Sequence, residues 1–146
     1  MEQFIGQKNI KYAAVNVARG IAVPATRTIL DEMLDGSTTA LVDIKYWPML
    51  EVGDIPGVPG WHYDVWNDPI KGKLDIHKLF ILGAGCRTEF KDKMIDEGKI
   101  FKYTGADAHR ITPVTLRGPR ILIRCSWTTL KPQNVRQNIG TYNGKN

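Results

Sequence analysis

This 146-residue sequence has little cysteine, no long hydrophobic run and no acidic residue after position 108. Its two cysteines, Cys86 and Cys125, lie far apart, which argues against a disulfide framework and favours free thiols in a reducing cytoplasm. The longest apolar runs, such as residues 79–82, are too short to cross a membrane. The first residues lack the basic and apolar segments of a secretory signal. We therefore expect a cytoplasmic protein without a membrane span.

The charge is distributed unevenly along the chain. The length fits one domain, and 42% hydrophobic with 24% charged residues is the composition of a soluble globular protein. Residues 109–146 contain seven Lys or Arg and no Asp or Glu, whereas residues 1–108 contain 13 basic and 15 acidic residues. Such a basic end can attract an anionic partner, nucleic acid included, or can serve as a solubilising tail. Both interpretations stay open.

The hydrophobic pattern predicts a mainly β domain over residues 1–130 and a polar, basic tail over 131–146. One helix is expected from Pro24 to Leu34, because a proline suits the first turn and apolar residues share one face. Short strand patterns at roughly ten-residue spacing, separated by Gly and Pro, favour a small sandwich or barrel over a βαβ sheet. The expected strands are 38–47, 61–66, 77–82, 87–90, 99–104, 108–114 and 120–130, the last two turning around residues 118–119.

The most informative motif is His62-Tyr63-Asp64, followed by His109. Alternate residues of a strand point to the same face, so His62 and Asp64 can offer an imidazole and a carboxylate to one metal ion. His109, from a second strand, can complete the set. Two histidines and one carboxylate leave other coordination positions open, which suits non-haem Fe(II) oxygen chemistry. The catalytic and metal-binding residues predicted here are therefore His62, Asp64 and His109.

The strand expected at 120–130 places Arg120, Arg124 and Ser126 on one face, with an apolar set on the other. A buried arginine is costly unless an anion pairs with it. A guanidinium holds a carboxylate best through two parallel hydrogen bonds. This face therefore predicts a carboxylate ligand, such as a keto-acid co-substrate.

These segments resemble a known family. His62-Tyr63-Asp64 resembles the metal motif of prolyl-4-hydroxylase-like Fe(II)/2-oxoglutarate oxygenases. The segment from His109 to Arg120, which contains Pro-Val-Thr and then Gly-Pro-Arg, resembles their second-histidine segment, and Phe80 to Phe90 is similar to their strand ending in Gly-Gly-Glu-Thr-x-Phe. The resemblance covers roughly residues 40–130.

The resemblance implies a double-stranded β-helix, the jelly-roll or cupin-like fold, with one N-terminal helix. It implies Fe(II) on the histidine–aspartate set and 2-oxoglutarate with its distal carboxylate on Arg120. The chain departs from the family by one extra residue before Gly118, and Arg124-Cys125-Ser126 is similar to the Arg-x-Ser carboxylate site of related oxygenases. The choice between Arg120 and Arg124 therefore stays open. Tyr46 and Thr88 are further candidate contacts to the co-substrate.

The implied activity is that of a 2-oxoglutarate-dependent dioxygenase that hydroxylates a substrate which the sequence does not identify. The main alternative is a non-catalytic, cupin-like protein that binds an anionic ligand or nucleotide, which the basic end would fit. A nucleic-acid-binding β-barrel ranks last, because few aromatic residues accompany the basic ones near the end of the chain.

Overall fold

The computed structural model describes residues 1–64 and 70–128. The expected domain end at 130, the tail at 131–146 and the last part of the expected strand 61–66 lie outside these residues. The elements, in chain order, are η1 (Glu2–Phe4), β1 (Ile10–Ala14), α1 (Val15–Ile21), α2 (Pro24–Leu34), β2 (Leu41–Leu50), η2 (Lys71–Leu74), β3 (Ile76–Leu82), β4 (Thr88–Phe90), β5 (Phe101–Thr104), β6 (His109–Ile111) and β7 (Gly118–Trp127).

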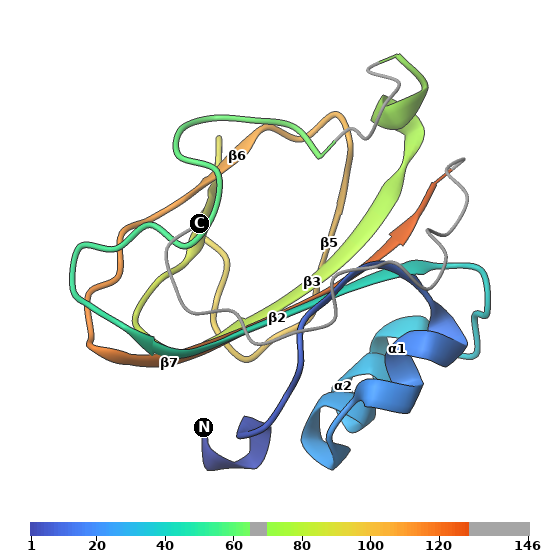
Figure 1. The fold of residues 1–146 in the computed structure, drawn as a ribbon. Helices are drawn as coiled ribbons and strands as arrows, with labels where there is room; N and C mark the ends of the chain where they lie inside the picture. The colour runs from blue at the N-terminus through green and yellow to red at the C-terminus, as the bar shows by residue number, and fades with distance from the viewer. Residues whose placement is uncertain (65–69, 129–146) are drawn as a thin grey trace.

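The larger sheet is antiparallel and has the strand order β1-β2-β7-β3-β5. Strand β7 lies at its centre, paired with β2 from Leu41↔Ser126 to Trp47↔Arg120 and with β3 along its other edge. The smaller layer consists of β4 and β6, extended by two isolated bridges, His62↔His109 and Glu89↔Met94. The two layers face each other in Figure 1, with β6 above the larger sheet.

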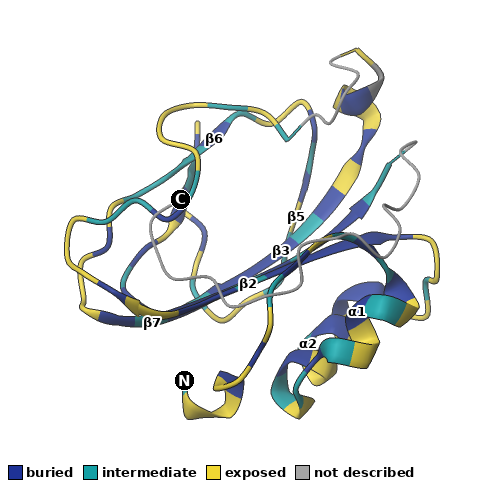
Figure 2. Cartoon of the chain, viewed as in Figure 1, coloured by how far each residue is buried: buried dark blue, intermediate teal, exposed yellow. Residues whose placement is uncertain are grey.

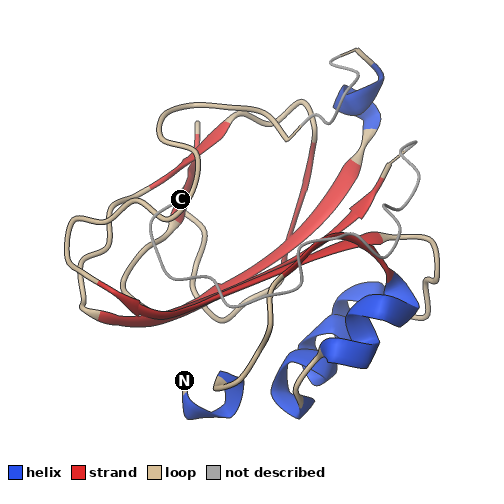
Figure 3. Cartoon of the chain, viewed as in Figure 1, coloured by secondary structure: helices blue, strands red, loops and turns tan. Residues whose placement is uncertain are grey.

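From β2 onward the chain passes repeatedly between the two layers. It runs from β2 to the His62 bridge, back to β3, across to β4 and Met94, back to β5, across to β6 and finally back to β7. Figure 3 shows how few helical turns interrupt these strands. This winding between two antiparallel sheets is that of a double-stranded β-helix, a jelly-roll arrangement. The predicted mainly β fold is confirmed.

Two helices cover the outer face of the larger sheet (Figure 1). The predicted helix is α2, with Pro24 in its first turn and Asp35 in the left-handed conformation at its end. The expectation of a single helix requires correction, because α1 precedes α2. Helix α1 contains Gly20, and only Val15 and Ala18 of its residues are buried. Its sequence therefore lacks the long apolar periodicity that predicts a helix.

The two faces of β7 differ as the alternation predicted. Ile121, Ile123 and Cys125 are buried in a core shared with the helices, whereas Arg120 and Arg124 face the space between the sheets. Figure 2 shows the buried strands of the larger sheet between its outer helices and the smaller layer. Tyr46 lies in the helix-side core, on the opposite face of the sheet from both arginines. Within the described residues, no helix is long and apolar enough to cross a membrane.

Two expected elements differ in the structure. Residues 61–64 form no strand, and His62 is held by one bridge in an otherwise irregular segment. The glycines and prolines at 53–60 explain this, because they form turns that continue up to the motif. Gly118 and Pro119 are not the turn that was expected; they begin β7. Strand β1 was not predicted, and its pairing with β2 contains an irregularity between Ile10 and Ala13.

Candidate metal centre

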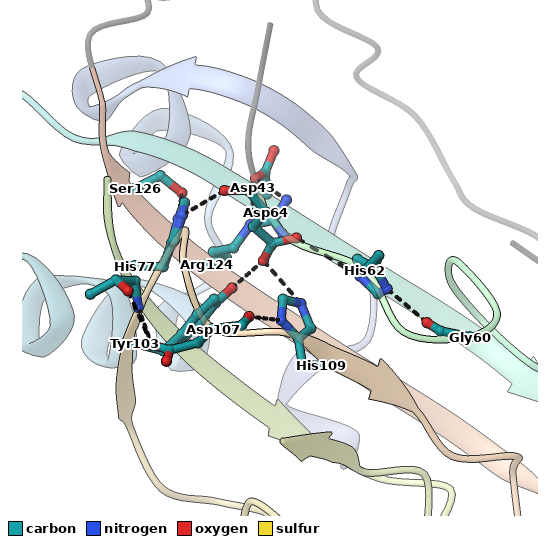
Figure 4. Close-up of polar contacts among 11 residues, drawn as sticks. Asp43, Gly60, His62, Asp64, His77, Tyr103, Asp107, His109, Arg124 and Ser126 are labelled. Carbon is teal, nitrogen blue, oxygen red and sulfur yellow. Dashed lines mark hydrogen bonds and ion pairs between the residues drawn. The ribbon is translucent and has the colours of Figure 1, made fainter. Parts of the chain in front are cut away.

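The backbone brings His62 and His109 directly opposite each other. Each amide donates to the other residue's carbonyl oxygen, both at 2.9 Å, and the two ring centroids lie 4.5 Å apart. Asp64 follows two positions later, with an oxygen 3.9 Å from His62 Nε2 and the other 3.2 Å from His109 Nε2. One ligand atom from each residue lies within 4.8 Å of the other two. The structure thus brings the three predicted metal ligands together (Figure 4).

Both imidazoles are fixed by backbone carbonyl groups. His62 Nδ1 lies 3.0 Å from the Gly60 oxygen, and His109 Nδ1 lies 3.0 Å from the Asp107 oxygen. A ring that donates its Nδ1 proton to a carbonyl keeps the Nε2 lone pair free. Donation from the remote nitrogen to a carbonyl is also the arrangement that orients metal-binding histidines. In both rings the free Nε2 faces Asp64, so the tautomers suit coordination.

Asp64 is held as a carboxylate by its neighbours. Arg124 Nη1 donates to Asp64 Oδ2 at 3.1 Å, and the Tyr103 hydroxyl donates to the same oxygen. Burial alone would raise the pKa of Asp64, but the Arg124 guanidinium and the contact with His109 hold that pKa well below its usual range. Burial also acts to lower the pKa of His109, and the interactions with Asp64 outweigh it and raise that pKa. The contact between His109 and Asp64 therefore favours the charged form of each group when no metal is bound.

A buried polar network supports this carboxylate from the larger sheet. Arg124 Nη2 donates to Asp43 Oδ2 at 2.7 Å, so one guanidinium joins Asp43 and Asp64. His77 contacts the Asp64 carbonyl oxygen through Nε2 at 3.0 Å and the Ser126 hydroxyl through Nδ1 at 2.8 Å. His77 is fully buried and lies outside the three-ligand group, so its contacts support the centre without completing it.

The centre opens into a cavity of about 250 Å³ between the two layers. Its floor is the inner face of β7 and the strands beside it, and its rim includes the exposed side chains of Val58 and Tyr63. Thr88, buried on β4, contributes to the wall. The charged side chains that line the cavity are Lys11, Lys45, Asp64, Arg120 and Arg124.

Arg120 lines the same cavity and is completely buried. Among the described residues, none of its three guanidinium nitrogens has a hydrogen-bond partner. The guanidinium carbon lies 5.1 Å from the centre of the Trp47 ring. Burial lowers the pKa of Arg120, whereas the Cys86 thiol, a weak acceptor, and the Glu97 carboxylate, beyond ion-pair distance, act in the opposite direction. An arginine nevertheless stays protonated in proteins, so a cation is enclosed here with no carboxylate at ion-pair distance among the described residues.

The close approach of two strands explains how Arg120 is enclosed. Gly83 has φ +104 and packs against the backbone of Pro119, where a Cβ would collide with the carbonyl oxygen. Only glycine adopts this conformation and leaves the space free. The end of β3 therefore packs closely against the start of β7, where the buried Arg120 lines the cavity.

The predicted site residues fall into three groups. His62, Asp64, His109, Arg120, Arg124 and Thr88 all line one cavity. Ser126 lies on the same face of β7 but is engaged by His77, and Tyr46 lies on the other side of the sheet.

Asp43, Tyr103 and Lys45 also belong to the site and were not predicted from the sequence. Asp43 and Lys45 are charged residues at alternate positions of a largely apolar strand. This spacing could have predicted that both lie on one face and belong to a polar site. Tyr103 shares a face with Phe101 in an alternating strand, but the partner of its hydroxyl depends on how three strands align. No local pattern could have indicated that contact.

No protein-family model and no curated protein matches this chain. Among solved structures, a cupin protein from Bacteroides fragilis is similar to it at 16% identity with a TM-score of 0.44, over 72% of this chain and 80% of that one. An uncharacterized conserved protein with a double-stranded β-helix domain from Klebsiella pneumoniae is similar at 9% identity with a TM-score of 0.40, over 71% and 76% of the two chains. At these identities the similarity concerns the fold alone.

Proposed function

We propose that this protein is an Fe(II)- and 2-oxoglutarate-dependent oxygenase that hydroxylates a small substrate. One observation carries the proposal: the cavity that contains the His62, Asp64 and His109 ligand group also contains Arg120, a fully buried cation without a hydrogen-bond partner among the described residues. A metal site alone would not require that arginine, and an anion site alone would not require three converging ligands. A metal-chelating dicarboxylate accounts for both features.

The ligand group suits Fe(II) in number, chemistry and support. Two imidazoles and one carboxylate leave positions open for a co-substrate and oxygen. Carbonyl groups orient both rings, and Arg124 and Tyr103 fix the carboxylate, as expected around a functional metal. When bound, Fe(II) would couple the oxidation of 2-oxoglutarate by O₂, which gives succinate and CO₂, to hydroxylation of a substrate C–H bond.

Of the two arginines considered for the co-substrate, Arg120 is the better candidate. Arg124 already binds two carboxylates, Asp43 and Asp64, and these would have to be displaced before it could take a third. Arg120 offers its guanidinium to an incoming carboxylate without breaking an ion pair. A bidentate contact in this buried setting would orient 2-oxoglutarate, and the enclosed floor would keep water from the reacting groups. We assign Ser126 to the support of His77 and not to the co-substrate.

The metal assignment is tested by iron stoichiometry under anaerobic conditions. Substitutions His62→Ala, Asp64→Ala and His109→Ala should each abolish binding of one equivalent of Fe(II), because each removes one of three ligands. His77→Gln is the matched control, since His77 is the third histidine of the chain and lies outside the group. It should keep stoichiometric iron. Retention of iron at unchanged affinity in His109→Ala would show that the three residues do not form the metal site.

The alternative, a non-catalytic cupin-like protein that binds an anion, shares the cavity and its cations but requires no iron. Succinate production from 2-oxoglutarate by the iron-loaded protein separates the two functions. An oxygenase should release succinate slowly even without its substrate, and His109→Ala should not. Anion binding without iron binding or succinate release would favour the alternative.

A further inference from the structure

Two cations that line the cavity, Lys45 and Lys11, are not used by the proposed metal and co-substrate. Lys45 lies in the middle of β2 on the inner face, between Asp43 and Trp47 and opposite Leu122 of β7. It is partly buried and lines the cavity. Within the described part of the chain its ammonium group has neither a hydrogen bond nor an ion pair. Lysine is almost never fully buried without a pairing group, and Lys45 is largely removed from solvent.

The two nearby carboxylates are already committed to other groups. Asp43 accepts hydrogen bonds from the Tyr12 amide at 2.9 Å and from two nitrogens of Arg124. Asp64 accepts from Arg124 and Tyr103, and it belongs to the ligand group. Neither carboxylate makes an ion pair with Lys45. The lysine is thus positioned by the sheet without being neutralised by it.

A second lysine extends this positive surface toward solvent. The irregular pairing of β1 places Tyr12 at φ +56, and the Asp43 carboxylate holds its amide there. Lys11 and Tyr12 both line the cavity as a result. Lys11 is exposed, so the cavity offers one cation at its mouth and another, Lys45, deeper inside.

The surroundings of Lys45 disfavour its positive charge, as expected of a cation that lacks an anionic partner. Burial, followed by repulsion from Arg124, lowers the pKa of Lys45 to about 8, with a smaller opposing effect from Asp43. The ammonium form therefore still predominates at neutral pH but is held at a cost. A divalent metal at the ligand group would add further positive charge, and one dianionic co-substrate would not balance all of it. An anionic group beside Lys45 would relieve the repulsion.

The dimensions of the cavity limit what this anion can be. A volume of about 250 Å³ lies below the range of typical ligand pockets, roughly 300–1,000 Å³, and the co-substrate must share it. Leu79 and Leu122 provide apolar wall, and Val58 and Tyr63 provide apolar rim. A small molecule with one acidic end and a short apolar body fits these surfaces.

We propose that Lys45, assisted by Lys11, binds the acidic group of a small anionic substrate, a carboxylate or a phosphate, beside the co-substrate site. This inference rests on the proposed function in treating the anion as the substrate that becomes hydroxylated. Lys45 would be a specificity-determining residue, since a neutral analogue of the substrate would leave its ammonium group unpaired in a desolvated site.

The test uses benzoate and inorganic phosphate as probe anions and benzamide as the neutral counterpart of benzoate. Binding is measured calorimetrically on the full chain loaded with Zn(II), a redox-inert substitute for iron, and saturated with 2-oxoglutarate. At least one of the two anions should bind saturably. If benzoate binds, benzamide should bind at least about tenfold more weakly, because it lacks the charge. Saturation by phosphate alone assigns the site to phosphates, and absence of binding by both anions overturns the inference.

Three variants connect that binding to Lys45. Lys45→Met should weaken the bound anion about tenfold or more, and Lys45→Arg should retain most of the affinity because the charge is kept. Lys102→Met is the matched control, since Lys102 is an exposed strand lysine outside the cavity, and it should bind like the wild type. Melting temperatures establish that each variant is folded. Equal affinity in Lys45→Met and wild type would overturn the inference.

Two further titrations separate this inference from the proposed function. If 2-oxoglutarate competes with the probe, Lys45 belongs to the co-substrate site and the inference of a second anion is wrong. The probe titration is also repeated without metal and 2-oxoglutarate. Lys45-dependent anion binding in a protein that binds neither iron nor 2-oxoglutarate would retain the anion site and reject the oxygenase. Binding of iron and 2-oxoglutarate without Lys45-dependent binding of the probe would retain the oxygenase and reject the anion site.

Discussion

Arg124 and Arg120 lie four positions apart on the same face of β7, yet their surroundings are opposite. Arg124 joins two carboxylates, Asp43 at 2.7 Å and Asp64 at 3.1 Å. Arg120 is more deeply buried and lies beside Trp47 and the Cys86 thiol, without a carboxylate at ion-pair distance among the described residues. The first is a charge that the fold neutralises itself. The second is a charge that the fold encloses without an ion pair among the described residues.

The difference follows from strand register. The residue opposite Arg124 on β2 is Asp43, whereas the residue opposite Arg120 is Trp47. A shift of four residues along β2 would place Trp47 opposite Arg124, or Asp43 opposite Arg120, and would keep the same face of each strand inward. The arginine that the fold neutralises and the arginine proposed to bind the co-substrate therefore share one strand, and their partners on the neighbouring strand distinguish them.

The largest expected effect comes from removing the neutralised arginine. Arg124→Leu should lower the free energy of unfolding by about 3–5 kcal/mol, because Asp43 and Asp64 would remain buried without their shared partner. Urea denaturation at neutral pH measures the loss. A change below about 1 kcal/mol would show that the two ion pairs do not support the centre.

The unpaired arginine should respond in the opposite direction. Arg120→Met should raise the free energy of unfolding of the ligand-free protein by about 1–3 kcal/mol, because an apolar side chain replaces an enclosed cation with unsatisfied donors. The same denaturation experiment tests it, with Arg124→Leu as the contrasting variant. A destabilisation as large as that of Arg124→Leu would mean that Arg120 has an internal partner, and the contrast between the two arginines would disappear.

A smaller effect is expected at Lys45, and it depends on pH. The folded-state pKa of about 8 lies below the ordinary value of 10.5, so the unfolded chain binds this proton more tightly. The destabilisation is full below pH 8 and fades as the pH rises toward 10.5. Lys45→Met should therefore be more stable than wild type by about 1–2 kcal/mol at pH 7, allowing for partial exposure of the group.

That advantage should shrink when denaturation is repeated at pH 9.5. Lys102→Met, which changes an exposed lysine, should alter stability by less than about 0.5 kcal/mol. If Lys45→Met destabilises the protein at pH 7, then Lys45 makes a favourable internal contact and is not held ready for an anion.

The sequence was sufficient for the parts of this molecule that depend on local pattern. Helix α2, the alternation along β7 and the three ligands of the centre were predicted from spacing and residue type, and the structure brings those ligands together. The pairing of Arg124 with Asp43 joins residues 81 positions apart, and it depends on register between strands. Hydrophobic alternation identifies the face of each residue but not its partner on the next strand. For that reason the sequence could not distinguish Arg120 from Arg124.

The irregular backbone around the centre was also beyond local pattern. The His-x-Asp motif was expected on a regular strand, yet His62 is fixed by a single bridge to His109. Strand β1 and helix α1 are short, and tertiary contacts of a few buried residues determine them more than propensity does. The position of β1 matters for the proposed function, because β1 brings Lys11 to the cavity.

The most direct test of the central claim is an anaerobic titration of 2-oxoglutarate into the Fe(II)-loaded protein, with wild type, Arg120→Met and Lys45→Met compared at equal iron content. The account predicts saturable binding that requires Fe(II) in the wild type and is essentially retained in Lys45→Met. In Arg120→Met the affinity should fall by about two orders of magnitude or more, with one equivalent of iron still bound. Wild-type protein that does not bind 2-oxoglutarate, or Arg120→Met that binds it as tightly as wild type, would contradict the account.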